Sequence, residues 1–188
     1  MYRLALICAP LVGACGSATD DRPPTLEYIT ETILAPSCAS AECHSAFKRQ
    51  VGDAFDTVES TRQSLVANSL VIPENQPDPD SSLLIATLTV GSPSILDPGS
   101  GNVRMPYDSP LPDADIELIR EWIRAGIPGA QCTPNDDNRG CSITRLGNGS
   151  IVYRVVECID GNIGNEIQTC GPSERCTFFS GNGQCVAF

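Results

Sequence analysis

A short segment of the chain combines residue types that bind metals and form covalent links. Four residues separate Cys38 from Cys43, and His44, the only histidine of the 188 residues, directly follows the second cysteine. Thiols form disulfides or thioethers, and an imidazole binds transition metals. A zinc site is disfavoured, because zinc takes four ligands and the adjacent Cys43 and His44 rarely bind one tetrahedral ion together. A small-loop disulfide with an incidental surface histidine stays open.

The same residues resemble a c-type haem attachment site. In such a site two thiols on a short loop add across the two vinyl groups of one porphyrin, and the next residue, a histidine, is held beneath the iron. The resemblance implies that Cys38 and Cys43 hold one haem c and that His44 is the proximal iron ligand. The common spacing has two residues between the cysteines, and wider loops like this one occur in some c-type cytochromes.

A methionine is the candidate for the second axial ligand. Met105 is the only methionine besides the initiator, and Pro106 follows it. A proline biases the preceding residue to an extended backbone, as expected for a loop that lays a thioether across a haem face. The alternative is a methionine packed in the core or exposed on a loop.

Two amphipathic stretches must position these groups. The first precedes Cys38, and its apolar residues recur at helical spacing: Leu26, Ile29, Ile33 and Leu34. The second runs from Leu111 to Gly126 and has an apolar stripe of Ile116, Ile119, Trp122 and Ile123. Acidic residues in its first turn, Arg124 in its last and Gly126 as a stop complete the helix pattern. We expect Trp122 to pack between the two helices rather than to take part in redox chemistry.

The order of these features over residues 25–130 resembles a family of small cytochrome c domains found in exported planctomycete-type proteins and bacterial lipoproteins. The shared order is a helix, Cys…Cys-His, Val71-Ile-Pro-Glu-Asn…Ser81-Ser-Leu-Leu, Met-Pro and a helix ending Trp-Ile-Arg-Ala-Gly. The resemblance implies a mainly α cytochrome c-like fold with Met105 as the distal ligand. It also implies one-electron transfer to and from unidentified redox partner proteins. The resemblance thus favours a non-catalytic electron carrier over an enzyme.

The N-terminus predicts export. Residues 1–14 combine an early Arg3 with a short apolar stretch, as in a signal peptide. Leu11-Val-Gly-Ala-Cys15 resembles a bacterial lipobox, which implies that Cys15 is acylated and that residues 15–24 form a tether. Gly16 after the cysteine favours the outer membrane, with the protein facing the periplasm or the surface. An ordinary secretory signal cut nearby is the alternative.

The segment 131–188 is predicted to be a small disulfide-rich β module. Its six cysteines would form three disulfides with one of 15 pairings: Cys132, Cys141, Cys158, Cys170, Cys176 and Cys185. Strand-forming residues fill 150–158, and Asn182-Gly183 predicts a hairpin turn between Cys176 and Cys185. The module is either a docking face for a redox partner or a surface polymer, or a passive cap.

Composition excludes several function classes. The formal charge is −11, with 12 basic and 23 acidic residues, so nucleic acid is not an expected partner. No Gly-x-Ser-x-Gly elbow or phosphate-binding glycine loop is present. The sequence therefore predicts a lipid-anchored c-type cytochrome with one haem c that carries single electrons. The alternative is a haem-free, disulfide-stabilised surface lipoprotein that acts as an interaction module.

Overall fold

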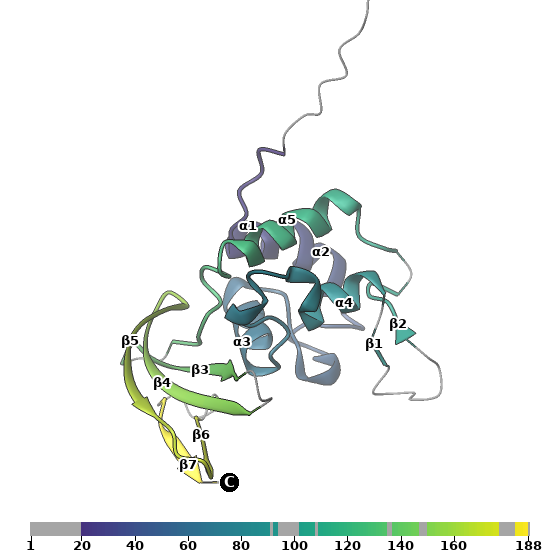
Figure 1. Ribbon diagram of the computed structural model, residues 1–188. Coiled ribbons are helices and arrows are strands. Elements are labelled where there is room, and N and C mark those ends of the chain that lie inside the picture. The colour runs from purple at the N-terminus through teal and green to yellow at the C-terminus, as the bar shows by residue number, and fades with distance from the viewer. Residues whose placement is uncertain are drawn as a thin grey trace, which may run out of the picture.

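The computed structural model describes residues 20–90, 92–93, 102–107, 109–134, 137–146, 150–176 and 183–187. The predicted signal peptide, Cys15 and most of the predicted hairpin turn at Asn182 lie outside the described residues. Figure 1 shows a helical region followed along the chain by a region of antiparallel strands, which lies beside and below it.

The N-terminal helix forms where the apolar periodicity predicts it and extends to Cys38. It consists of α1 (Leu26–Ile29), a π-helical turn (Thr30–Leu34) and α2 (Ala35–Cys38) without interruption. The Thr25 hydroxyl caps the helix by accepting a hydrogen bond from the backbone N–H of Tyr28. The apolar residues of its inner face are buried.

Three further α-helices complete the helical region. They are α3 (Val58–Ala67), α4 (Leu83–Thr89) and α5 (Asp113–Arg124), with 3-10 turns at Gln50–Gly52, Pro73–Asn75 and Pro79–Ser81. The predicted C-terminal helix is confirmed as α5, and its apolar stripe is buried. Trp122 is fully buried, as expected, and its indole N–H donates to the Pro128 carbonyl at 3.0 Å. The core around it is built from aliphatic residues and one phenylalanine, chiefly Leu26, Ile29, Ile33, Phe55, Leu65, Ile85, Leu118, Ile119 and Ile123.

The predicted fold class, a mainly α cytochrome c-like domain followed by a small disulfide-rich β module, is wrong. The described α-helices are short, with four residues in α1 and twelve in the longest, α5. A two-stranded sheet of β1 (Ser92–Pro93) and β2 (Asn102–Val103) interrupts them. Pro73 and Pro79 each begin a short 3-10 turn, because the first position of a helical turn does not need the N–H that proline lacks. The described chain mixes short helices with antiparallel sheets and is not an all-α cytochrome domain.

The strands after residue 138 form two more antiparallel sheets. One has the order β3 (Arg139–Arg145), β4 (Ile151–Ile159) and β5 (Asn162–Thr169), and the other pairs β6 (Glu174–Cys176) with β7 (Cys185–Ala187). We call residues 139–187 the β module. Its three disulfides are confirmed, and they pair Cys132 with Cys158, Cys141 with Cys176 and Cys170 with Cys185. These disulfides indicate an oxidising, extracellular or periplasmic environment.

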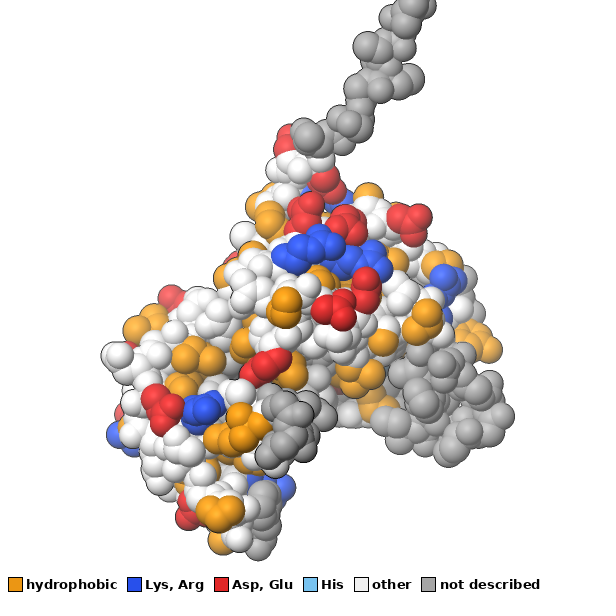
Figure 2. Space-filling model, viewed as in Figure 1, with side chains coloured by type: hydrophobic (Ala, Val, Ile, Leu, Met, Phe, Trp, Pro, Cys, Tyr) orange, Lys and Arg blue, Asp and Glu red, His pale blue; other side chains and the backbone are white. Residues whose placement is uncertain are grey.

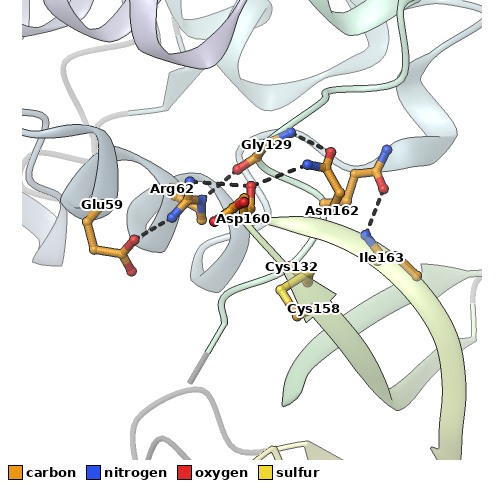
Figure 3. The surroundings of a disulfide bond; sticks show 9 residues. Glu59, Arg62, Gly129, Cys132, Cys158, Asp160, Asn162 and Ile163 are labelled. Carbon is orange, nitrogen blue, oxygen red and sulfur yellow. Dashed lines mark hydrogen bonds and ion pairs between the residues drawn. A yellow bond between two sulfur atoms is a disulfide. The ribbon is translucent and has the colours of Figure 1, made fainter. Parts of the chain in front are cut away.

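Arg62 of α3 joins the helical region to the β module (Figure 3). Its Nε donates to the Gly129 carbonyl at 2.6 Å, Nη2 lies 3.5 Å from the Asp160 carbonyl, and Nη1 pairs with Glu59. On the other side of the contact, the Gly129 N–H donates to the Asn162 side chain at 2.8 Å. The backbone N–H of Gln131 donates to the Gly161 carbonyl at 2.8 Å. A buried arginine and backbone hydrogen bonds thus fix the two regions together, next to the Cys132–Cys158 disulfide.

No helix in the described ranges is both long enough and apolar enough to span a bilayer.

Candidate functional site

The candidate site is the loop that connects α2 to α3, and its first turn folds Cys43 and His44 back onto the end of α2. Cys38 is the last residue of α2. The His44 N–H donates to the Cys38 carbonyl at 3.1 Å, and the Cys43 N–H donates to the Ser40 carbonyl at 3.0 Å. The backbone therefore brings the two cysteines and the histidine of the sequence motif to one turn.

The second half of the loop holds this turn in place. The Gln50 N–H donates to the Cys43 carbonyl at 3.2 Å, and the Phe55 N–H donates to the His44 carbonyl at 2.8 Å. The Ser64 hydroxyl of α3 then exchanges hydrogen bonds with both backbone groups of Ala54. The turn that carries the thiols is thus tied through the rest of the loop to α3.

The loop also contains backbone strain. Arg49 has φ of 48° and Val51 has φ of 52°, a left-handed conformation that is costly for a β-branched residue. Strain of this kind persists only where surrounding contacts impose it, and it concentrates at functional sites. The hydrogen bonds of Cys43 and His44 to either side of these residues supply such contacts.

Cys38 and Cys43 are free thiols, whereas the other six described cysteines are all in disulfides. Cys43 is exposed and Cys38 is half-buried. Burial, together with a smaller effect of the nearby Cys43, raises the pKa of the Cys38 thiol to about 11. Cys38 is therefore protonated at neutral pH, which disfavours zinc binding and spontaneous thiolate chemistry.

His44 is half-buried, and its Nδ1 atom has no hydrogen-bond partner in the part of the chain that the structure describes. The ring packs edge-on against Phe55, with centroids 5.4 Å apart and an interplanar angle of 61°. Leaving a buried polar atom unsatisfied costs about 1–3 kcal/mol. Such atoms in native sites call for an explanation, such as a redox role or a bound ion.

Two residues near the turn were not identified from the sequence. Phe47 is an exposed apolar side chain of the loop, with 88% of its surface accessible. Asp53 is buried, and its Oδ1 accepts a hydrogen bond from the Asn68 side chain at 2.5 Å. Burial raises the pKa of Asp53, while Asn68 and the charges of His44 and Arg49 act in the opposite direction. Burial of a charged residue has no local sequence signal, so only the structure identifies Asp53.

Met105 lies beside α4. Its backbone N–H donates to the Thr87 carbonyl at 2.9 Å, and its side chain is 36% exposed rather than packed in the core. None of the described hydrogen bonds, ion pairs or ring contacts joins it to Cys38, Cys43 or His44. The structure thus gathers three of the four predicted haem residues and leaves the fourth on a separate segment.

No group of three or more His, Cys, Asp and Glu residues that could hold a metal ion occurs within the described ranges. This finding bears on a zinc site, which draws its ligands mainly from side chains. It does not bear on haem, because the porphyrin itself supplies most of the iron ligands and the protein adds only the axial ones.

Comparisons with known proteins find no relatives. No protein-family model matches the chain, and no curated protein and no solved structure matches it either. No family is therefore assigned to the chain, and the resemblance of its motifs to small cytochrome c domains remains a prediction.

Proposed function

We propose that residues 38–44 attach one haem c covalently and that the protein carries single electrons at a membrane surface. Cys38 and Cys43 would form the two thioether bonds, and His44 would bind the iron. One observation carries the proposal. Six of the eight described cysteines are oxidised, and the two that are not adjoin the only histidine.

Free thiols require an explanation in a protein whose other described cysteines indicate an oxidising compartment. Disulfides persist in oxidising environments, where neighbouring thiols become oxidised as well. Either thioether bonds to haem or a disulfide between Cys38 and Cys43 would account for both thiols. His44 favours haem, because a disulfide between the two thiols would give the adjacent histidine no role.

Two exposed apolar side chains of the same loop would be available to contact a flat apolar ligand. Phe47 is almost fully exposed, and Val51 of the same loop is 49% exposed. When bound, haem would supply one-electron redox chemistry. The chain would contribute the covalent link, a fixed imidazole and apolar side chains that exclude water.

In this proposal Met105 would be the second iron ligand that the chain supplies. Its exposure is at odds with a core residue, and a methionine exposed on a loop remains the alternative to an iron ligand. A methionine opposite histidine raises the reduction potential relative to other axial pairs. Replacement of Met105 by alanine should abolish the weak far-red absorption band of a sulfur-iron bond. An unchanged spectrum would show that another ligand, or none, occupies that position.

The lipid anchor at Cys15 and the outer-membrane location belong to the same proposal. The disulfides support export from the cytoplasm, and the lipobox-like segment before Cys15 supports acylation. Several acyl chains on one residue meet the requirement for stable anchoring, which a single chain does not.

Haem staining of a denaturing gel tests the proposal. The full chain would be produced together with a c-type haem attachment system, and the stain should follow the protein band after acid-acetone extraction. The double variant Cys38→Ser/Cys43→Ser should lose the stain. Ser40→Ala, an exposed change within the same turn, should retain it.

An unstained band would overturn the haem proposal. A disulfide between Cys38 and Cys43 in that unstained protein would favour the second candidate, a haem-free surface lipoprotein that acts as an interaction module. Its supporting observation is that the hydrogen bond from the His44 N–H to the Cys38 carbonyl brings the two free cysteines to one turn.

A further inference from the structure

The last residues of the predicted tether are fixed to the fold rather than free. Arg22 donates from Nη1 to Asp115 at 2.5 Å and from Nη2 to the Ala114 carbonyl at 3.0 Å. Its Nε also donates to Asp20 at 2.9 Å. Both Ala114 and Asp115 lie in the first turn of α5, so Arg22 fastens the incoming chain to the N-terminal end of that helix.

The segment that follows strengthens this attachment. The Thr25 N–H donates to the Pro23 carbonyl at 2.9 Å, and Thr25 caps α1. Leu26 is buried in the core. We call Asp20–Leu26 together with Asp113–Glu117 the tether end of the molecule.

A lipid on Cys15 would be close to the tether end. Four residues separate Cys15 from Asp20 along the chain, so five residue-to-residue steps join them. An extended chain spans at most about 3.5 Å per residue, so the reach is about 18 Å whatever path these residues follow. The tether end therefore stays near the bilayer surface for as long as Arg22 holds its contacts.

The β module extends in another direction. In Figure 1 the N-terminal trace meets the fold at α1 and α5, and the β6–β7 sheet lies at the opposite end of the molecule. The β module does not swing round on a free linker, because Arg62 and the backbone of Gly129 and Gln131 fix it to the helical region.

We propose that the bilayer faces the tether end and that the β6–β7 end of the β module points away from it. The proposal rests on acylation of Cys15. Charged side chains gather near the tether in Figure 2. Arg22 forms ion pairs there with Asp20 and with Asp115 of α5. Charged groups are costly in hydrocarbon, so the tether end lies against the lipid headgroups and does not insert.

Paramagnetic relaxation in a lipid nanodisc tests the orientation. The acylated full chain would be anchored in nanodiscs that contain lipids spin-labelled at the headgroup, and backbone amide signals would be recorded by NMR. The amides of the tether end should broaden several-fold more than those of β6 and β7. Equal broadening at the two ends, or stronger broadening in β6 and β7, would overturn the proposal.

A matched pair of variants tests the role of Arg22. Arg22→Gln removes the contacts to α5, so the chain is no longer held to the fold before Thr25. The ten residue-to-residue steps from Cys15 to Thr25 can then span about 35 Å. The difference in broadening between the two ends should then shrink at least twofold. Arg124→Gln removes an arginine that pairs with Glu117 on the same helix, and it should leave the pattern unchanged. An unaltered pattern in Arg22→Gln would show that Arg22 does not set the orientation.

Mass spectrometry of the same sample separates this proposal from the anchor on which it depends. A chain without acyl groups on Cys15 would contradict the proposed anchor and, with it, the orientation. An acylated chain with the wrong broadening pattern would contradict the orientation alone. Haem attachment would be unaffected in both cases.

Discussion

The helical region and the β module differ in how they use cysteine. The helical region has a continuous aliphatic core around Trp122, and its two described cysteines are free. In the β module the buried clusters consist largely of cysteines, with Val155 and Val156 as the buried aliphatic residues. All of its cysteines, together with Cys132, are bonded.

The difference reflects how much apolar surface each region buries. A region with a sufficient core does not need covalent cross-links, whereas small β structures with few buried side chains depend on them. Cysteine in the helical region is therefore dispensable for folding and available for chemistry. This contrast supports a functional role for Cys38 and Cys43. Four sets of substitutions test the difference between the two regions.

Loss of a β-module disulfide should have the largest effect. Cys141 and Cys176 are 35 residues apart, so their disulfide restricts a long loop of the unfolded chain. Replacing both by serine should lower the free energy of unfolding of the β module by roughly 4 kcal/mol. Hydrogen exchange should show β3–β5 losing protection while α5 retains it. Cys38→Ser/Cys43→Ser is the control and should leave β3–β5 protected. If α5 lost protection together with the strands in the Cys141/Cys176 variant, the two regions would not differ as proposed.

A methyl group at Gly161 should disturb the contact between the regions. Gly161 has φ of 79°, and a Cβ there would lie 1.9 Å from the Gly129 carbonyl oxygen. Gly161→Ala should cost about 3 kcal/mol from overpacking and positive φ. Chemical denaturation followed by the fluorescence of Trp122 and by far-UV circular dichroism would measure it.

Gly52→Ala is the matched control for Gly161→Ala. Gly52 has φ of 90°, but a Cβ there would have no atom within 4 Å. Its cost should be limited to the backbone conformation, about 1–2 kcal/mol. If the two variants lost the same free energy of unfolding, a side chain at position 161 would have room beside Gly129, contrary to the structure.

Loss of the Arg62 side chain should weaken the coupling between the regions. Arg62→Ala removes the donor to the buried Gly129 carbonyl and should cost about 2 kcal/mol. Thermal unfolding should separate into two transitions, one for each region, where the parent protein gives one. Arg120→Ala removes surface ion pairs with Asp80 and Glu117 and should cost at most about 1 kcal/mol. A single transition in Arg62→Ala would show that other contacts suffice for coupling.

The smallest effect concerns Asp53, a buried carboxyl in the helical region. Its pKa is raised above 3.8 in the folded state, so the folded state binds the proton more tightly than the unfolded state. Stability should therefore fall as pH rises from 3.8 through the folded-state pKa of Asp53. Asp53→Asn does not ionise, so its stability relative to the parent protein should increase over that pH range and then level off. Urea denaturation at a series of pH values measures the difference, and a difference that does not vary with pH would contradict the burial of Asp53.

Sequence patterns predicted the elements that have strong periodicity. The stripe of Ile116, Ile119, Trp122 and Ile123 located α5, and the apolar spacing before Cys38 located α1 and the turn that follows it. Local patterns work there because burial of one helical face depends on spacing alone. The cysteine content also predicted disulfides in the β module. The sequence could not predict which cysteines bond to each other, because that depends on the register of the strands that carry them. Cys141, for example, lies opposite Val155 across β3 and β4.

Local sequence patterns did not predict the fold class or the burial of two charged residues, Arg62 and Asp53. A similar order of motifs does not specify helix length: α3 already ends at Ala67, and α4 begins only at Leu83, where the Ser82 hydroxyl caps it. Arg62 and Asp53 look like surface residues in the sequence. Their burial depends on partners distant in the chain, Gly129 for Arg62 and Asn68 for Asp53.

The central claim is that the cysteines of the helical region attach a cofactor, whereas the cysteines of the β module stabilise its fold. Peptide mapping by mass spectrometry under non-reducing conditions tests it most directly, on protein produced with a haem attachment system. We predict one peptide that carries haem on both Cys38 and Cys43, together with the three disulfide-linked pairs of the β module. A peptide in which Cys38 and Cys43 are joined to each other, or are both free thiols, would contradict the claim.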